Sequence, residues 1–217
     1  MNASTMNASR FGMAASWAAT ASAAVSIALL AGCASPSPAP VLLALPPAMN
    51  GAPAVATAPA PGASAPLLAV RRVNIPEYLV ARRVRFRADA ATLAEWPNTY
   101  WAERIEIGVS REFVSALRQQ LPGWAVCDAG CGDQSPALSL QVDIVPMDYV
   151  RSAQKLVARA RITLQATDVS QRTLRSVELA YEIPAGADTA QAQAQAVTEL
   201  IRQIATATAP LVTNTKR

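Results

Sequence analysis

The sequence has three cysteines and no histidine among its 217 residues, which narrows the chemistry available to its side chains. Without histidine there is no imidazole acid–base catalysis, no Ser-His nucleophile and little basis for a zinc site. Cys127 and Cys131 stand four positions apart, which predicts a local disulfide across a turn in an oxidising compartment. A redox-active pair and two free thiols remain alternatives, although the spacing differs from that of the CxxC redox motif.

The third cysteine, Cys33, follows a segment typical of an export signal. Arg10 is the only charged residue before it, and the run between them is rich in Ala, Ser, Val and Leu. A positive start, an apolar stretch and small residues at its end define a secretory signal peptide. The ending Leu30-Ala31-Gly32-Cys33 resembles the bacterial lipobox. It predicts cleavage between Gly32 and Cys33, a diacylglycerol on the Cys33 thiol and an acyl chain on the new amino group.

Such a modification would fix the chain to a membrane. Two or more acyl chains anchor a protein stably, since each buried CH₂ contributes about 0.8 kcal/mol. An uncleaved membrane helix with a chance cysteine is the alternative, but the apolar run is only marginally long enough to span a bilayer and is rich in Ala and Ser. Ala34 stands where Asp would favour inner-membrane retention, so we expect the periplasmic face of the cell outer membrane. Apart from the lipid on Cys33, we expect no cofactor and no metal.

The charged residues are distributed unevenly along the chain. No Asp, Glu, Lys or Arg lies between Arg10 and Arg71, and the net charge of +4 is too diffuse to indicate a nucleic-acid partner. Residues 33–66 contain nine prolines and predict an extended tether, within which residues 41–45 (VLLAL) predict a short strand docked on the main sheet. We therefore expect a signal peptide at 1–32, a lipidated tether at 33–66 and a periplasmic domain at 67–217.

The domain combines strands with two helices. Apolar residues with a period of two, or short apolar runs, predict strands at 67–75 (an edge or half-exposed strand), 82–87, 124–127, 138–144, 156–167 and 173–183, the last two forming a hairpin. Amphipathic stripes predict helices at 101–121, capped by Asn98 or Thr99, and at 189–207, capped by Asp188 or Thr189. Because each strand has one apolar face, we expect an α+β fold, a mostly antiparallel sheet with both helices packed on one face.

One strand concentrates positive charge. Arg82, Arg83, Arg85 and Arg87 form a basic cluster that predicts binding to anionic lipid headgroups or to an acidic partner. A solvated strand face explains the same pattern without a ligand. The sequence contains no Gly-rich phosphate loop, no GxSxG elbow and no HExxH motif, so we expect no enzyme.

Two short motifs, taken together, resemble those of a known protein family. Val73-Asn74-Ile75-Pro76-Glu77-Tyr78-Leu79 is followed about twenty residues later by Trp101-Ala102-Glu103-Arg104, which we expect to open the first helix. With the lipobox and the Pro-rich lead-in, the chain resembles the ABC-type transport auxiliary lipoproteins, the PqiC-like family linked to membrane integrity.

The resemblance implies a non-enzymatic docking subunit of an MCE-type intermembrane lipid transport system. Its partners would be an MCE-domain protein that bridges the periplasm and the associated transporter, and a ring of like copies would match a tubular bridge. The candidates for the docking face, or for core packing, are Pro76, Glu77, Tyr78, Leu79, Trp101, Ala102, Glu103 and Arg104. The alternative is a lipid-binding module that holds an acyl chain between sheet and helices, beside Ala158, Ala160 and Ala166.

Overall fold

The computed structural model describes residues 38–48, 65–128, 131–132 and 135–216. The predicted signal peptide, Gly32 and Cys33 lie outside the described residues. Pro40–Arg217 forms one compact unit. This unit has its own hydrophobic core, since every described core side chain, from Leu43 to Val212, belongs to it.

The centre of the sheet is one long strand, β6 (Leu138–Val150), which pairs antiparallel with β7 (Lys155–Ala166). β8 (Thr173–Pro184) pairs antiparallel with β7, so the predicted hairpin is present. Leu138, Leu140, Val142 and Ile144 are buried and alternate with half-exposed residues, as the period of two predicts. The pairing of β6 with β7 shifts between Ile144 and Met147, around Pro146, which has no N–H to donate to the ladder.

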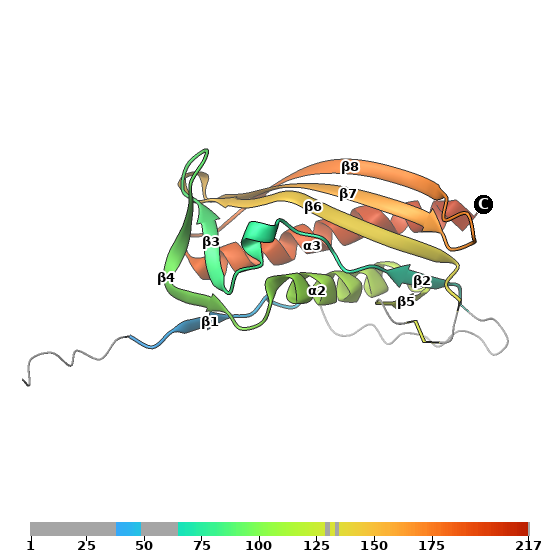
Figure 1. The fold of residues 1–217 in the computed structure, drawn as a ribbon, viewed down its shortest axis with the longest axis horizontal. Coiled ribbons are helices and arrows are strands. Elements are labelled where there is room, and N and C mark those ends of the chain that lie inside the picture. The colour runs from blue at the N-terminus through green and yellow to red at the C-terminus, as the bar shows by residue number, and fades with distance from the viewer. Residues whose placement is uncertain (1–37, 49–64, 129–130, 133–134, 217) are drawn as a thin grey trace, which may run out of the picture. The chain divides into compact units, whose positions relative to one another are not determined.

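The other edge of β6 is shared by two groups of strands (Figure 1). Near its C-terminal end, β6 pairs with β3, which leads through β4 to β1. Near its N-terminal end, β6 pairs with β2, which pairs in turn with β5. The bounds are β1 Val41–Leu43, β2 Leu67–Val70, β3 Arg83–Arg87, β4 Leu93–Trp101 and β5 Ala125–Cys127.

The prediction of a mostly antiparallel sheet is wrong. Among the described strands, the pairs β1–β4, β2–β5, β2–β6 and β3–β6 are parallel and the other three are antiparallel, so the sheet is mixed. Alternating side chains locate a strand but carry no information on its direction relative to a neighbour. A strand is present there, β2, but the prediction that it lies at an edge or is half-exposed is wrong, because β2 lies between β5 and β6 and three of its four residues are buried.

Two long helices complete the α+β fold. α2 (Ile105–Gln120) and α3 (Ala190–Thr213) pack against each other, and Figure 1 shows both on the same side of β6, β7 and β8. The predicted stripes are buried in both helices. The Thr189 hydroxyl accepts a hydrogen bond from the backbone N–H of Ala192 at 3.1 Å, which confirms one of the two predicted caps of α3. α3 continues beyond the predicted end at 207 because Val212 is still buried in the core.

The start of the first helix differs from the prediction. Residues 101–104 do not open α2, because Trp101 is the last residue of strand β4 and α2 begins at Ile105. Asn98 and Thr99 lie within β4 and cap no helix. Trp101 falls at helical spacing from Ile105, so the apolar stripe of α2 extends without a break into the preceding strand, which the sequence pattern concealed.

Part of the segment predicted as tether belongs to the compact unit. Leu43, Leu45 and Ala48 are buried. The Ala48 N–H donates to Glu112 Oε2 at 3.0 Å. On the far side of residues 49–64, which are outside the described part of the chain, the Pro66 carbonyl accepts from the Ala125 N–H at 3.0 Å. Both flanks of residues 49–64 are therefore fixed to the compact unit.

Candidate functional site

The first predicted motif and the basic cluster meet at one carboxylate. Tyr78 lies in a short 3₁₀ helix, Glu77–Leu79, and its hydroxyl donates to Asp148 Oδ1 at 2.8 Å. Arg87 Nε donates to Asp148 Oδ2 at 2.9 Å, and the Arg87 guanidinium lies 5.9 Å from the centre of the Tyr78 ring. Strands β3 and β6 are thereby joined to the 3₁₀ turn.

The electrostatics of this contact fix its protonation. Burial, and then the hydrogen bond to Asp148, raise the pKa of Tyr78 to about 12, so its phenol remains a donor. The hydrogen bond to Asp148 also raises the pKa of Arg87. Neither group changes charge near neutral pH. The Tyr78–Asp148–Arg87 contact is therefore suited to holding the turn in place and unsuited to proton transfer.

The remaining arginines of the cluster divide into two kinds. Arg85 is held by Glu95 Oε1, 3.2 Å from its Nε, and by the Tyr78 carbonyl, 2.8 Å from its Nη1. Arg83 lies 5.1 Å from the Tyr100 ring centre and 3.4 Å from Glu95, but half of its side chain is exposed. Arg82 is exposed and has no side-chain partner among the described residues. Arg82 and Arg83 are therefore the members of the cluster most available to a ligand.

The second predicted motif connects elements. Trp101 is buried, and its N–H donates to the Arg82 carbonyl at 2.8 Å, while the Ala102 N–H donates to the Leu43 carbonyl at 2.7 Å. Glu103 pairs with Arg111 of α2 at 2.7 Å. Arg104, at the N-cap position of α2, pairs with Glu106. In the described structure, residues 101–104 hold β1, β3 and α2 together, and Trp101 contributes to the core.

Several contacts of the site were not predicted from the sequence. Asp148 and Glu95 pair with the arginines, and Gln193 of α3 accepts from Trp96 Nε1 and donates to the Arg85 carbonyl, both at 2.7 Å. Glu95 and Trp96 belong to β4, the strand missed by sequence analysis. Trp96, a large aromatic residue nine positions after the alternating segment 82–87, was the available signal for a further strand.

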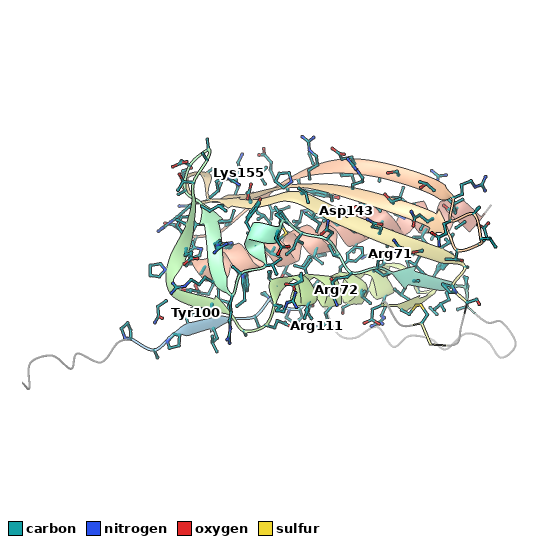
Figure 2. The ribbon with its side chains drawn as sticks, viewed as in Figure 1. Arg71, Arg72, Tyr100, Arg111, Asp143 and Lys155 are labelled. Carbon is teal, nitrogen blue, oxygen red and sulfur yellow. A yellow bond between two sulfur atoms is a disulfide. The ribbon has the colours of Figure 1, made fainter. Side chains whose placement is uncertain are left out.

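Two surface grooves accompany these contacts. One, the β1 groove, has a volume of about 530 Å³. Its lining residues are Pro40, Leu42, Ala81, Arg82, Arg83, Arg85, Glu95, Asn98 and Tyr100. The other, the α2 groove, measures about 440 Å³ and is lined by Val70, Arg71, Arg72, Ile107, Ser110, Arg111, Val114 and Asp128. Figure 2 shows Tyr100 near β1, and Arg71, Arg72 and Arg111 beside α2.

The interior and the cysteines were also part of the sequence predictions. A pocket between sheet and helices, lined by Met147, Leu156 and Val197 among others, measures only about 10 Å³, which is room for a single water.

Cys127 and Cys131 are joined by a disulfide with Cα atoms 5.4 Å apart. The described residues contain no cluster of three or more potential metal ligands. None of the described helices is both long and apolar enough to cross a bilayer.

Comparison with known proteins identifies a family and a fold. The family model described as ABC-type transport auxiliary lipoprotein component matches residues 48–209. The crystal structure of an uncharacterized protein superposes with a TM-score of 0.64 at 17% identity, covering 81% of this chain and 99% of that one. A Xanthomonas campestris protein of the DUF330 family model gives 0.57 at 17% identity, covering 82% and 95%. No curated protein matches the sequence. At these identities the two structures establish the fold alone.

Proposed function

The chain belongs to the ABC-type transport auxiliary lipoprotein family, and from this premise we propose that it is a docking subunit of an MCE-type intermembrane lipid transport system. The family match carries the proposal, because residues 48–209 include all of α2, α3 as far as Ala209 and every described strand except β1. The proposed role is non-enzymatic. The domain holds the end of a periplasmic bridge at the outer membrane, where lipid leaves or enters the bilayer.

In this proposal the anchor is the lipidated thiol of Cys33. Only residues 34–39 separate Cys33 from Pro40, the first residue of the compact unit. Seven residues at 3.3–3.6 Å each span at most about 25 Å. Residues 49–64 add nothing to this reach, since the chain is fixed to the compact unit on both sides of them. The proposed tether is therefore short and keeps the domain close to the bilayer surface.

The docking role is tested with the native chain. Membranes carrying a C-terminally tagged chain are crosslinked and solubilised, and proteins captured with it are identified by mass spectrometry. We expect an MCE-domain protein among them. Capture of the chain without any MCE-domain protein or transporter component, under crosslinking that retains a known neighbour in the same membrane, would contradict the docking role.

The anchor is tested separately from the docking. Cys33→Ser removes the thiol that would receive diacylglycerol, so we expect an unprocessed precursor that takes up no labelled palmitate. Ala34→Ser, next to it, leaves the thiol in place and serves as the matched control. Normal processing and outer-membrane fractionation of Cys33→Ser would refute lipid anchoring.

The alternative function, an acyl chain carried between sheet and helices, receives no support from the interior described here. Ala158 and Ala160, two of the small residues that suggested space, are buried against the core. The nearby interior pocket of about 10 Å³ is far below the several hundred Å³ of a typical ligand site. We therefore retain the docking role alone.

A further inference from the structure

Strand register places an aliphatic, an aromatic and a cationic side chain in one row. Leu42 of β1 pairs with Tyr100 of β4, and Tyr100 pairs with Arg83 of β3. Paired residues in adjacent strands project from the same face of a sheet. Their chain neighbours Leu43 and Trp101 project from the opposite face and are buried. The row therefore lies on the outward face of this part of the sheet.

An irregularity in β4 opens this face into a groove. Between the pairs Arg83–Tyr100 and Arg85–Glu95, β3 advances by two residues whereas β4 advances by five. The extra residues of β4 include Asn98, whose φ of 48° lies in the left-handed region that Asn tolerates better than most residues. The bulge displaces β4 locally, and Asn98 forms part of the β1 groove.

The groove is cationic on one side and apolar on the other. Arg82, Arg83 and Arg85 face a single acid, Glu95, so three positive charges against one negative leave a net charge of +2. Leu42, on the opposite side, has 58% of its surface exposed. An arginine pair beside an exposed aliphatic residue and a tyrosine matches the boundary between lipid headgroups and acyl chains, where cations meet phosphate and tyrosine is favoured.

The groove also lies where the chain enters the compact unit. Pro40, the first residue of that unit, is one of its lining residues. An anchor at Cys33 is at most about 25 Å away along the extended chain. The groove is therefore within reach of the bilayer in which the anchor would insert, and this step rests on the proposed function.

We propose that the β1 groove binds anionic phospholipid headgroups of the membrane that carries the anchor. Arg82 and Arg83 donate charge-assisted hydrogen bonds to the lipid phosphate. Leu42 and Tyr100 contact the glycerol and the upper acyl chains. Arg85 contributes charge but is held by Glu95 and the Tyr78 carbonyl. The anchor supplies attachment, and the groove sets which side of the domain faces the bilayer.

The α2 groove is the comparison surface. Arg71 and Arg72 are exposed, and their side chains have no partner among the described residues. The third arginine there, Arg111, pairs with Glu103 and Glu112, and Asp128 also lines the groove. Arg71 and Arg72 carry the same charge as Arg82 and Arg83, but they lie in the α2 groove and not in the β1 groove.

Flotation with vesicles tests the proposal without the anchor. The chain from residue 33 onward, carrying Cys33→Ser, contains the whole compact unit and no lipid. We expect it to float with phosphatidylglycerol vesicles at about 0.15 M salt, weakly at about 1 M salt, and not with phosphatidylcholine vesicles. The double variant Arg82→Glu, Arg83→Glu should lose at least about tenfold in partition, and Leu42→Ser should lose partition without a change in salt dependence.

The matched control is Arg71→Glu, Arg72→Glu, which makes the same charge change in the α2 groove and should retain most of the partition. Circular dichroism and the unfolding midpoint confirm that each variant is folded. Absence of binding to phosphatidylglycerol, or an equal loss in both double variants, would overturn the groove assignment. Either result leaves the MCE co-purification untouched, because this test contains neither anchor nor transport partner.

Discussion

At the scale of single residues, one carboxylate organises the predicted motif. Asp148 receives both the Tyr78 hydroxyl and Arg87 Nε, and Arg85 donates to the Tyr78 carbonyl. The turn that carries Tyr78 has no buried residue of its own. It is therefore held by these polar contacts together with the packing of the half-buried Leu79 against the core. Each polar contact contributes on the order of 1 kcal/mol, or somewhat more where a charge is involved.

Removing the Tyr78 hydroxyl should lower stability in a pH-dependent way. The pKa of Tyr78 rises from 10.0 to about 12 on folding, so its contribution is complete below pH 10 and is lost as the pH rises toward 12. We expect Tyr78→Phe to lower the free energy of unfolding by about 1 kcal/mol at neutral pH. As the pH rises from 10 toward 12, the difference between the two proteins should disappear.

Guanidinium unfolding of the two proteins at neutral and at high pH measures this difference. The other tyrosines are present in both chains, so their titration cancels in the comparison. A difference that is unchanged at high pH would show that the Tyr78 hydroxyl is not held as the contact with Asp148 implies.

At the scale of elements, β1 is short but belongs to the core. It has three residues, yet Leu43 is buried and Leu45 and Ala48 continue the contact beyond the strand. Its neighbour Leu42 is exposed. Leu43 therefore stabilises the fold by packing in the core, whereas the adjacent Leu42 lines the outward β1 groove.

Leu43→Ala and Leu42→Ala form a matched pair that separates these purposes. We expect Leu43→Ala to lower the free energy of unfolding by about 2 to 4 kcal/mol, because it leaves a cavity in the core. Leu42→Ala should change it by less than about 0.5 kcal/mol. Chemical denaturation measures both, and equal effects would mean that β1 does not dock as described.

Much of the architecture could be predicted from the sequence, because the spacing of apolar residues reflects which face of a helix or strand is buried. The stripes of α2 and α3 and the alternation in β6 and β7 reflect one buried face each, whereas the apolar residues of β8 are mostly half-buried. Strand direction and partner choice could not be predicted, since they depend on segments far apart in the chain. Asp148 is 70 residues from Tyr78 and 61 from Arg87, and no local pattern records such a pairing.

At the scale of the whole molecule, few residues separate the proposed anchor at Cys33 from the compact unit. The predicted tether spans 33–66, but the compact unit already begins at Pro40. Residues 49–64 are flanked by Ala48 and Pro66, both hydrogen-bonded to the domain. Length added before Pro40 and length added within 49–64 should therefore have different consequences.

Insertion of about twenty Gly and Ser residues tests this asymmetry. Placed after Ala34, the insertion should lower energy transfer between a dye on the domain and a dye-labelled bilayer, since a flexible chain of this length adds roughly 25 Å on average. The same insertion after Ala54 should leave the transfer unchanged. Equal loss of transfer from both positions would show that the chain before residue 65 acts as one tether.

The position of β1 has a mechanical consequence. It is the first described element after the proposed lipid attachment, and it occupies an end of the sheet, where its only partner among the described strands is β4. A pulling force between bilayer and domain would act first on this three-residue strand. If β1 peeled away, the chain up to Ala65 would be released, roughly 30 residues that extend to on the order of 100 Å. The chain between the proposed anchor and the domain would then be short while β1 is paired and long once tension has detached it.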